Sequence, residues 1–327
     1  MHQISYEALR ELYARSRSSR PFLKWAGGKQ PFLARYADRF PRLVGRYIEP
    51  FMGSASAFFF LKRLETRPFL ATLADTNLQL VRTFIEVRDN PQTVLERLEN
   101  LRQGYYDASN RAAFYSYTRQ QYNNALPRVD AATFIFLNRT CWNGLYRVNR
   151  AGKFNVPHGP AKGNATFPSE ADLLNAAASL AHAEIRAMTW QNTIASSERG
   201  DFIFADPPYF SDCAVSDTKY SRLQFTLESH RELARRLSSA AERGVDFMLT
   251  NSAEPEMMEL YAEHRFDIEQ VRVPRFISSK TDQRVPTTEV IVRPAGAGGP
   301  RQLLLADELA DMVASLDEEA DLLAGDA

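Results

Sequence analysis

The sequence predicts an α/β fold built around a parallel sheet. Short apolar runs at Tyr47-Ile48 and Leu70–Ala74 end in acidic or glycine-containing turns, and helix-like stretches at 54–64 and 78–88 follow them. This alternation is typical of βαβ units, which produce parallel sheets. Sheet-type sequence resumes at Asp201, so we expect the sheet to continue after an interruption.

Length and composition are those of an ordinary globular protein. The chain has 327 residues, which corresponds to about two domains of ~150 residues each, and it is 44% hydrophobic and 24% charged. These values exclude small disulfide scaffolds and wholly disordered chains. The two cysteines, Cys141 and Cys213, are too few for a disulfide framework and lack metal-ligand spacing. We therefore expect a reducing, cytoplasmic environment and no metal site.

The sequence shows no signal for export or membrane insertion. Its longest apolar stretch, residues 51–61, ends at Lys62-Arg63 and is too short to span a bilayer as a helix. The N-terminus has no apolar core of the kind found in secretory signals. We expect a protein that is neither exported nor embedded in a membrane.

The other elements lie on either side of an insert. Residues 1–20 form an N-terminal extension with helical apolar spacing and a polar linker, and the main body covers residues 21–101 and 167–296. After the insert, the expected elements are a buried strand at 202–205, a helix at 227–243, a strand at 247–250, and an antiparallel pair at 268–273 and 288–292. A linker then leads to an acidic tail, residues 297–327, whose apolar spacing predicts an amphipathic helix.

The insert, residues 102–166, is basic and rich in aromatic residues. It carries nine basic residues, two acidic residues and eleven aromatic rings. Basic charge interleaved with rings suits a surface that contacts phosphates and unstacked bases. The alternative is a helical subdomain whose rings form its core, and we expect this for most of them. Residues 145–149 and 153–156 flank a turn with Gly152, which predicts a β-hairpin with Arg147 and Asn149 on one face.

The motif Asp206-Pro207-Pro208-Tyr209 stands at the carboxyl end of a predicted strand, where ligands gather in open α/β sheets. Two prolines fix φ and remove both N–H groups, which leaves hydrogen-bond acceptors beside an aromatic ring. An exocyclic amine on a base has two N–H donors and a π-face, so Asp206 and the Pro207 carbonyl can accept while Tyr209 stacks. The alternative is a strand-ending turn with Asp206 as a cap.

Two further motifs contain glycine. In the segment 47–56, Gly53 and small neighbours at a helix start would let the backbone approach a cofactor, and Asp75 ends the next strand where an acidic group can accept from ribose hydroxyls. The alternatives are a tight turn at Gly53 and a helix N-cap at Asp75. The segment before Lys29 lacks the frame of a P-loop, so we disfavour a P-loop NTPase.

Six segments in this order resemble the Dam-type (D12 class) DNA adenine-N6 methyltransferases. They are KWAGGK (24–29), EPFMGSAS (49–56), LADTN (73–77), NRTCWNGLYRVNRAGKFNVPHG (138–159), ADPPY (205–209) and FISS…TTEVIV (276–292). The resemblance covers roughly residues 20–295. It implies a Rossmann-like S-adenosylmethionine-dependent methyltransferase fold, with the body as catalytic domain and the insert, residues 102–166, as a mainly helical target-recognition domain.

The resemblance also implies roles for individual residues. The cofactor S-adenosylmethionine would be lined by Trp25, Lys29, Phe51, Gly53, Asp75 and Asp206. The flipped adenine would be held by Asp206, Pro207, Pro208 and Tyr209. Double-stranded DNA, with GATC as target, would be contacted by Lys24, Arg139, Trp142, Asn143, Leu145, Arg147 and Pro157. We expect a monomer, and the sequence leaves open whether a cognate restriction endonuclease accompanies it.

One position departs from the family pattern. The family usually has a second glycine in its F-x-G-x-G motif, and this chain has Ala55. If the position needs a positive φ or bare backbone contact, a methyl group would weaken cofactor binding, whereas an ordinary conformation would make it harmless.

The expected reaction is direct methyl transfer without a metal or a covalent intermediate. Asp206 and Pro207 would draw both N–H groups of adenine N6 and localise its lone pair toward the methyl donor. Three alternatives stay open at this point: an N4-cytosine methyltransferase, a methyltransferase acting on RNA or on protein glutamine, and a catalytically silent DNA-binding protein. Intact Asp206 and Tyr209 argue against the silent protein.

The formal net charge of zero hides an uneven distribution. The insert has a net charge of +7 and the tail, residues 297–327, has a net charge of −7. Neutrality is therefore no argument against a nucleic-acid partner. It supports the hypothesis that the acidic tail competes weakly with DNA for the basic insert.

Overall fold

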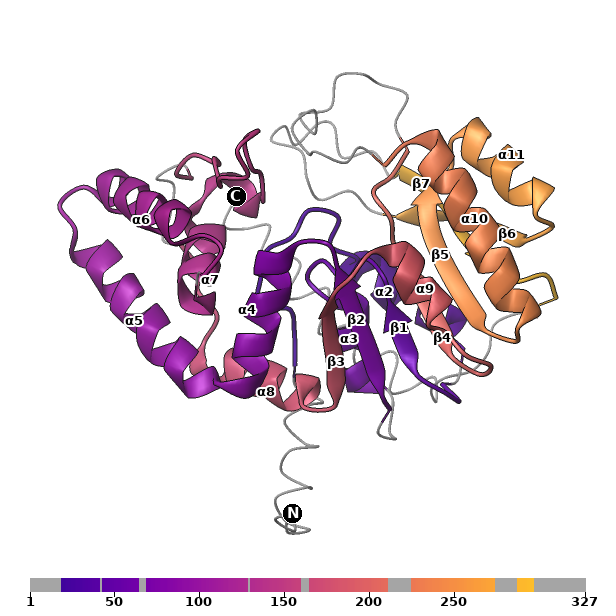
Figure 1. Ribbon diagram of the computed structural model, residues 1–327, viewed down its shortest axis with the longest axis horizontal. Helices are drawn as coiled ribbons and strands as arrows, with labels where there is room; N and C mark the ends of the chain where they lie inside the picture. The colour runs from indigo at the N-terminus through magenta and orange to yellow at the C-terminus, as the bar shows by residue number, and fades with distance from the viewer. Residues whose placement is uncertain are drawn as a thin grey trace, which may run out of the picture.

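A seven-stranded sheet forms the centre of the described part of the computed structural model (Figure 1). The structure describes residues 19–41, 43–64, 69–128, 130–159, 165–210, 225–273 and 287–296. The strands are β1 (Tyr47–Glu49), β2 (Ala71–Asp75), β3 (Ala183–Ala187), β4 (Phe202–Ala205), β5 (Asp246–Ser252), β6 (Asp267–Val273) and β7 (Thr287–Arg293). Their order in the sheet is β3-β2-β1-β4-β5-β7-β6, in which β3 to β5 are parallel and β7 is antiparallel to both neighbours.

Helices cover both faces of the sheet and extend beyond one edge. They are α2 (Gln30–Arg35), α3 (Ser56–Leu64), α4 (Leu78–Asp89), α5 (Pro91–Asp107), α6 (Arg111–Ala125), α7 (Ala131–Thr140), α8 (Glu170–Leu180), α9 (Trp190–Ala195), α10 (Leu227–Glu242) and α11 (Pro255–Glu263), with short 3₁₀ turns η1 (Ala37–Arg39) and η2 (Trp142–Gly144). In Figure 1, α5, α6 and α7 lie together at one side of the molecule, and α10 and α11 lie at the other.

Alternating strand residues produce two separate cores, one on each face of the sheet. Tyr47 and Phe204 point to the face covered by α2 and α3, where Tyr47 contacts Phe58 with ring centroids 6.4 Å apart. Ile48 and Ile203 point to the opposite face and belong to the core formed with α9, α10 and α11. This period-two alternation in strands buried on both faces is typical of a three-layer α/β sandwich.

The strand and helix predictions for the body are confirmed. The strands expected at 47–48, 70–74, 202–205 and 247–250 are present, and the pair at 268–273 and 288–292 is antiparallel as predicted. Strand β3 was not predicted, because its alternating burial at the sheet edge leaves few apolar residues to mark it. The helices expected at 5–15 and in the tail, together with Cys213, lie outside the described residues.

The predicted start of the insert falls within a helix. Residue 102, the predicted boundary, lies inside α5, which starts at Pro91. Proline is favoured in the first helical turn because its missing N–H needs no partner there, so Pro91 marks the helix start. Helix α7 packs against α4, α5 and α6 and connects this helical unit to the body.

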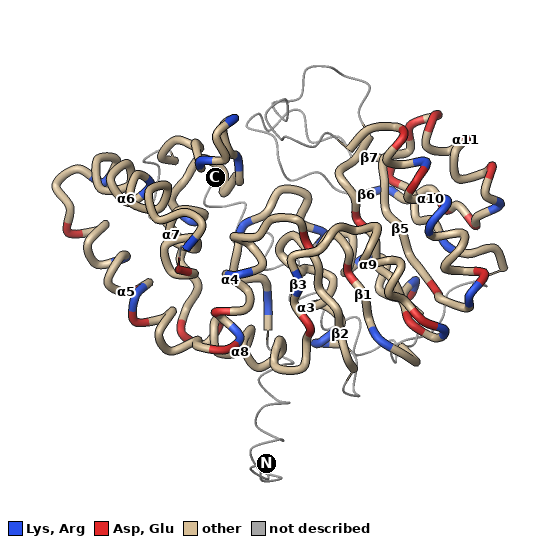
Figure 2. The backbone as a smooth tube through the Cα atoms, in the orientation of Figure 1, with Lys and Arg blue, Asp and Glu red and all other residues tan. Residues whose placement is uncertain are grey.

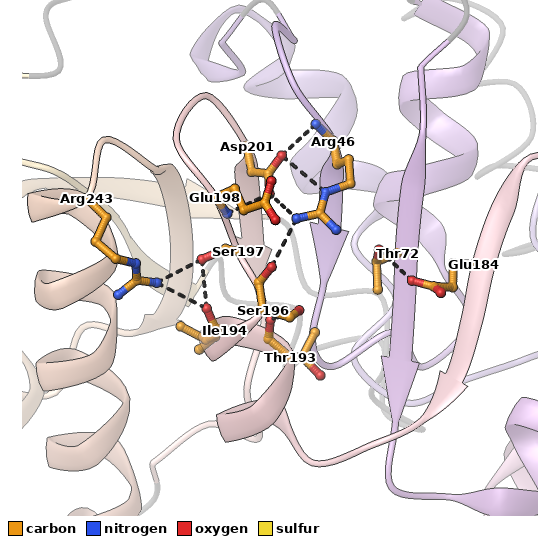
Figure 3. Close-up of polar contacts among 10 residues, drawn as sticks. All are labelled: Arg46, Thr72, Glu184, Thr193, Ile194, Ser196, Ser197, Glu198, Asp201 and Arg243. Atoms are coloured by element: carbon orange, nitrogen blue, oxygen red, sulfur yellow. Dashed lines mark hydrogen bonds and ion pairs between the residues drawn. The ribbon is translucent and has the colours of Figure 1, made fainter.

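A polar cluster joins the amino ends of β1 and β4 (Figure 3). It lies at the opposite end of these strands from the predicted catalytic loop, residues 206–209. Arg46 donates to both carboxylate oxygens of the buried Asp201, from its backbone N at 2.9 Å and from its guanidinium at 2.7 Å. The guanidinium also donates to the Ser196 carbonyl at 3.0 Å. This pair fixes β1 beside β4, the point where the strand order reverses and where α/β sheets bind ligands at their carboxyl ends.

Candidate active site

The Asp206 carboxylate is held by neighbours from two other segments. It follows β4 directly, and its Oδ1 accepts a hydrogen bond from Thr250 of β5 at 2.7 Å. The Lys29 ammonium lies 3.2 Å from the same oxygen. No described residue donates to Oδ2, so this oxygen can accept from a bound group. Burial raises the pKa of Asp206 above the usual range of an aspartate, while Lys29 and the Thr250 hydrogen bond act in the opposite direction.

Tyr209 belongs to the same cluster. Its hydroxyl donates to Oε2 of Glu289 on β7 at 2.7 Å, and the Lys29 ammonium contacts that hydroxyl and lies 4.2 Å from the ring centroid. Burial, with the nearby carboxylates Asp206 and Glu289, raises the pKa of Tyr209 well above its usual value. The phenol is therefore a neutral ring with a fixed hydrogen-bond partner. Lys29, expected among the cofactor residues, lies against Asp206 and Tyr209, which are expected to hold the adenine.

The exit of the catalytic loop is fastened to β5. The Phe210 N–H donates to Oδ1 of Asn251 at 3.4 Å, and the Ser252 hydroxyl donates to the Phe210 carbonyl at 3.1 Å. Asn251 is itself buried and donates to the Tyr261 hydroxyl at 2.8 Å. These contacts hold the end of the loop, and the two prolines restrict its backbone, which pre-organises its acceptors.

The glycine segment forms a cradle beside the catalytic loop. Gly53 has φ +46°, and a Cβ there would lie 2.9 Å from Cδ1 of Trp25, so only glycine fits beneath the indole. Its N–H donates to Oδ2 of Asp75 at 3.3 Å, and Asn77 N–H donates to Oδ1 at 2.8 Å. The cap of α4 is Asn77 and not Asp75, which removes the simple alternative for Asp75. Trp25, Gly53 and Asp75 therefore meet at the carboxyl ends of β1 and β2.

Phe51 lies on the other side of this segment. Its ring stacks on Trp190 with centroids 6.0 Å apart and meets Phe225 edge to face at 5.6 Å. Phe51 thus packs with the core under α9 and α10. Trp25 instead stacks on Tyr146, a residue of the insert, with ring centroids 5.7 Å apart. The two predicted cofactor rings flank the segment from different layers of the fold.

Ala55 has the left-handed backbone conformation that glycine adopts most readily. Its φ is +54°, a region that costs an L-residue other than glycine ~1–2 kcal/mol. The side chain is completely buried in the core around α3, so its methyl group does not face open space. The cost of Ala55 is therefore backbone strain, and no methyl group projects from this position to obstruct a ligand.

Four of the predicted DNA residues lie where the loop that contains Lys24 and precedes α2, called the Lys24 loop below, meets the segment after α7. Lys24, Trp142, Asn143 and Leu145 are all exposed, with Trp142 46% and Leu145 37% accessible. Pro157 is exposed as well, and its carbonyl accepts from the Trp142 N–H at 3.0 Å. The exposed Trp142 and Leu145 side chains give this surface an apolar part beside the Lys24 ammonium.

The buried Asn138 joins the two halves of this surface. Its amide nitrogen donates to the carbonyls of Lys24 at 2.7 Å and Gly144 at 3.1 Å, and its Oδ1 accepts from the Lys24 N–H at 2.8 Å. A Cβ at Gly144 would lie 2.4 Å from Cβ of Lys24, and Gly144 has φ +62°. The close fit and the hydrogen bonds make the Lys24 loop and residues 142–145 one rigid surface.

The predicted hairpin is present in a short form. An antiparallel bridge joins Val148 to Phe154, and Asn155 N–H donates to the Arg147 carbonyl at 3.0 Å. The Arg147 guanidinium is held by Oδ1 of Asn155 at 2.9 Å. Figure 2 shows basic positions, in blue, on this projecting segment beside α6 and α7. Most rings of the insert are buried or half-buried core, as expected, whereas Tyr117 and Trp142 are exposed.

Arg139 requires a correction. It was expected to contact DNA, but it lies in the last turn of α7 with its guanidinium turned into the body, where Nη2 donates to the Phe22 carbonyl at 2.8 Å. Burial lowers its pKa to about 10. Arg139 therefore ties the insert to the Lys24 loop, and we leave it out of the DNA-contacting set.

Three residues of the site were not predicted from the sequence. Thr250, Glu289 and Asn138 are polar, and each is buried or largely buried within a strand or helix. Glu289 stands in the TTEVIV segment that contributes to the resemblance, where a charged residue within an apolar strand is the one available signal.

Within the described ranges, no helix is long and apolar enough to cross a membrane, and no cluster of potential metal ligands occurs.

Comparison with known proteins gives the family. Residues 25–275 match the model for D12 class N6 adenine-specific DNA methyltransferases. The chain is 32% identical to the type II methyltransferase M.MjaIII of Methanocaldococcus jannaschii, over 81% of this chain and 95% of that protein. It is 31% identical to the DNA adenine methylase of Escherichia coli K12, over 84% and 95% of the two chains. The site geometry and these matches agree, and the chain belongs to the D12 class of N6 adenine-specific DNA methyltransferases.

Proposed function

We propose that the protein transfers a methyl group from S-adenosylmethionine to N6 of an adenine that has left the DNA duplex, within the sequence GATC. The observation that carries the reaction is the Asp206 carboxylate, fixed through Oδ1 by Thr250 and Lys29, with no donor to Oδ2 among the described residues, beside the Tyr209 ring. The GATC target is supported by the similarity to the E. coli DNA adenine methylase.

The cradle fits S-adenosylmethionine. Trp25 supplies a flat ring, Gly53 supplies bare backbone, and Asp75 supplies carboxylate oxygens that can accept from ribose hydroxyls. When bound, the cofactor supplies an electrophilic methyl group on a positively charged sulfur. Because Asp206 follows β4 and the cradle follows β1 and β2, the two sites lie side by side at the reversal of strand order.

The residues of the catalytic loop prepare the adenine. Oδ2 of Asp206 and the Pro207 carbonyl accept the two N–H groups of N6, while Tyr209 stacks on the ring. These acceptors turn the N6 lone pair out of conjugation and toward the methyl donor. They also stabilise the positive charge that develops on N6. After the methyl group has bonded to N6, one of the two N6 protons is released to solvent. Pro208 keeps the loop rigid.

We infer that the surface formed by Lys24, Trp142, Asn143 and Leu145 reads the target, with Arg147 on the adjoining hairpin. The exposed Trp142 ring is placed to enter the base stack, and the basic side chains of Lys24 and Arg147 can donate to guanine edges. We further propose that α5, α6, α7 and the hairpin form the target-recognition unit.

The specificity is tested with short duplexes that contain GATC or one altered base pair. We expect the ratio of kcat/KM between the GATC duplex and an altered duplex to fall in Arg147→Ala by the equivalent of about 1–3 kcal/mol at one base pair. Arg150→Ala, at the turn of the same hairpin, is the matched control. Equal methylation of all duplexes by the wild-type protein would reject GATC, and unchanged discrimination in Arg147→Ala would reject the role of Arg147.

A further inference from the structure

Glu289 lies beside the catalytic loop, on the strand that pairs with β5. It is opposite Ser252 in the β5–β7 register, and its side chain is 14% exposed. A single oxygen, Oε2, accepts from the Tyr209 hydroxyl at 2.7 Å and from the Lys29 ammonium at 3.3 Å. A carboxylate so enclosed is retained only with good partners, because an unpaired buried charge is costly.

The first contact fixes the stacking ring. The hydrogen bond at the far end of the Tyr209 side chain fixes the position of its hydroxyl oxygen, and because a phenol O–H lies in the plane of its ring, the direction of the acceptor also favours one ring plane. The rest of the loop fixes the backbone of Tyr209 but not the plane of its ring. Glu289 is the described side chain that accepts a hydrogen bond from this hydroxyl, so it sets the orientation in which the ring meets a base.

The second contact restrains Lys29. The ammonium lies between two carboxylates, at 3.2 Å from Oδ1 of Asp206 and 3.3 Å from Oε2 of Glu289. Without Glu289, Asp206 would be the one described carboxylate paired with the ammonium, beside its contact with the Tyr209 hydroxyl. Glu289 therefore draws Lys29 away from Oδ2 of Asp206, the oxygen to which no described residue donates.

We propose that Glu289 is a positioning residue of the adenine site, which orients the Tyr209 ring and holds Lys29 away from the second oxygen of Asp206. This inference rests on the proposed function. Asp206, Glu289 and Lys29 together carry one net negative charge, which suits a step in which positive charge develops on N6. Glu289 acts through Tyr209 and Lys29 and does not itself contact the base.

The test compares Glu289→Ala, Glu289→Gln, Tyr209→Phe and the double variant Glu289→Ala/Tyr209→Phe. Methyl transfer is followed by kcat and KM, and base stacking by the fluorescence of 2-aminopurine at the target position of the duplex. We expect Glu289→Ala to lower kcat at least about tenfold, with KM for DNA within about threefold of wild type, since the loss of one charge-assisted hydrogen bond has this size. In the protein–DNA complex, the fraction of 2-aminopurine that is quenched by stacking on Tyr209 should decrease in parallel.

The pattern across variants separates positioning from general destabilisation. Glu289→Gln keeps an acceptor for the Tyr209 hydroxyl and should retain the quenched fraction while losing part of kcat. The effects of Glu289→Ala and Tyr209→Phe should be less than additive. Glu269→Gln is the control, because this glutamate on β6 pairs with Arg39 at 2.9 Å outside the site; its kcat and fluorescence should match wild type.

Two results would overturn the inference. One is a wild-type quenched fraction in Glu289→Ala, and the other is full additivity of Glu289→Ala with Tyr209→Phe. If the wild-type protein itself does not methylate adenine, the proposed function fails instead, so the two failures are distinguishable.

Discussion

Asn138 and Lys24 exchange two hydrogen bonds, since the Lys24 N–H donates to Oδ1 of Asn138 at 2.8 Å and Nδ2 donates back to the Lys24 carbonyl at 2.7 Å. This exchange joins a loop that leads to the cofactor cradle to the segment proposed to read DNA. A shift in either segment is therefore transmitted to the other.

Replacing this amide should weaken target discrimination. Asn138→Ala leaves three backbone groups without their partner and should cost about 1–3 kcal/mol of unfolding free energy. We expect the preference for the cognate duplex over a single-base-pair variant to fall. Val245→Ala, which removes two buried methyl groups in the core under α10, is the stability-matched control and should keep its preference. Equal preference in both variants would contradict the prediction.

Thr250 should contribute to catalysis by holding the Asp206 carboxylate. Thr250→Val keeps the shape of the side chain and removes the 2.7 Å hydrogen bond, so kcat should fall about tenfold to a hundredfold. Because that hydrogen bond lowers the pKa of Asp206, its loss raises the pKa, and the acid limb of the kcat profile should move to higher pH. Thr250→Ser retains the hydroxyl and should keep most activity. An unshifted acid limb in Thr250→Val would count against this role.

Ala55 should tolerate glycine but not a β-branched residue. Ala55→Gly relieves ~1–2 kcal/mol of strain and loses a buried methyl group and chain stiffness of similar total size. We expect the free energy of unfolding to change by less than about 1 kcal/mol, with cofactor affinity nearly unchanged. Ala55→Val should destabilise strongly, since a β-branched side chain is a severe outlier at positive φ. Chemical denaturation and cofactor titration measure both effects, and a large gain in affinity for Ala55→Gly would contradict the account.

His230 should make stability depend on pH. It is fully buried, its Nε2 has no hydrogen-bond partner among the described residues, and burial lowers its pKa to about 4. Between pH 7 and 5 the unfolded chain, with a histidine pKa of about 6.5, takes up a proton that the folded chain does not. The free energy of unfolding should therefore fall by about 2 kcal/mol on acidification over this range. His230→Gln should show a smaller fall, and an equal fall in both proteins would contradict the assignment.

The sequence predicts the framework of the fold well because the body follows simple periodicities. The strands at 202–205 and 247–250 are continuous apolar runs, and their burial on both faces follows from that pattern. Strand β3 escapes prediction because only its pairing with β2 defines it. The predicted boundary at residue 102 rests on composition, which does not indicate that α5 already begins at Pro91.

The site is predictable only in part, because its contacts connect residues distant in the chain. Asp206 and Tyr209 stand out in the sequence, but Thr250 and Glu289 become partners only through the pairing of β4 with β5 and of β5 with β7. No local pattern sets φ of Ala55 or the inward turn of Arg139. Both follow from packing between the cradle, α3, α7 and the Lys24 loop.

The most direct test of the central claim is chemical analysis of the methylated base. Unmethylated duplex DNA is incubated with labelled S-adenosylmethionine and either the wild-type protein or Asp206→Ala, and the DNA is then digested to nucleosides. We predict that the label is found in N6-methyldeoxyadenosine with the wild-type protein and is absent with Asp206→Ala. Label in N4-methyldeoxycytidine, or equal labelling by the two proteins, would contradict the account.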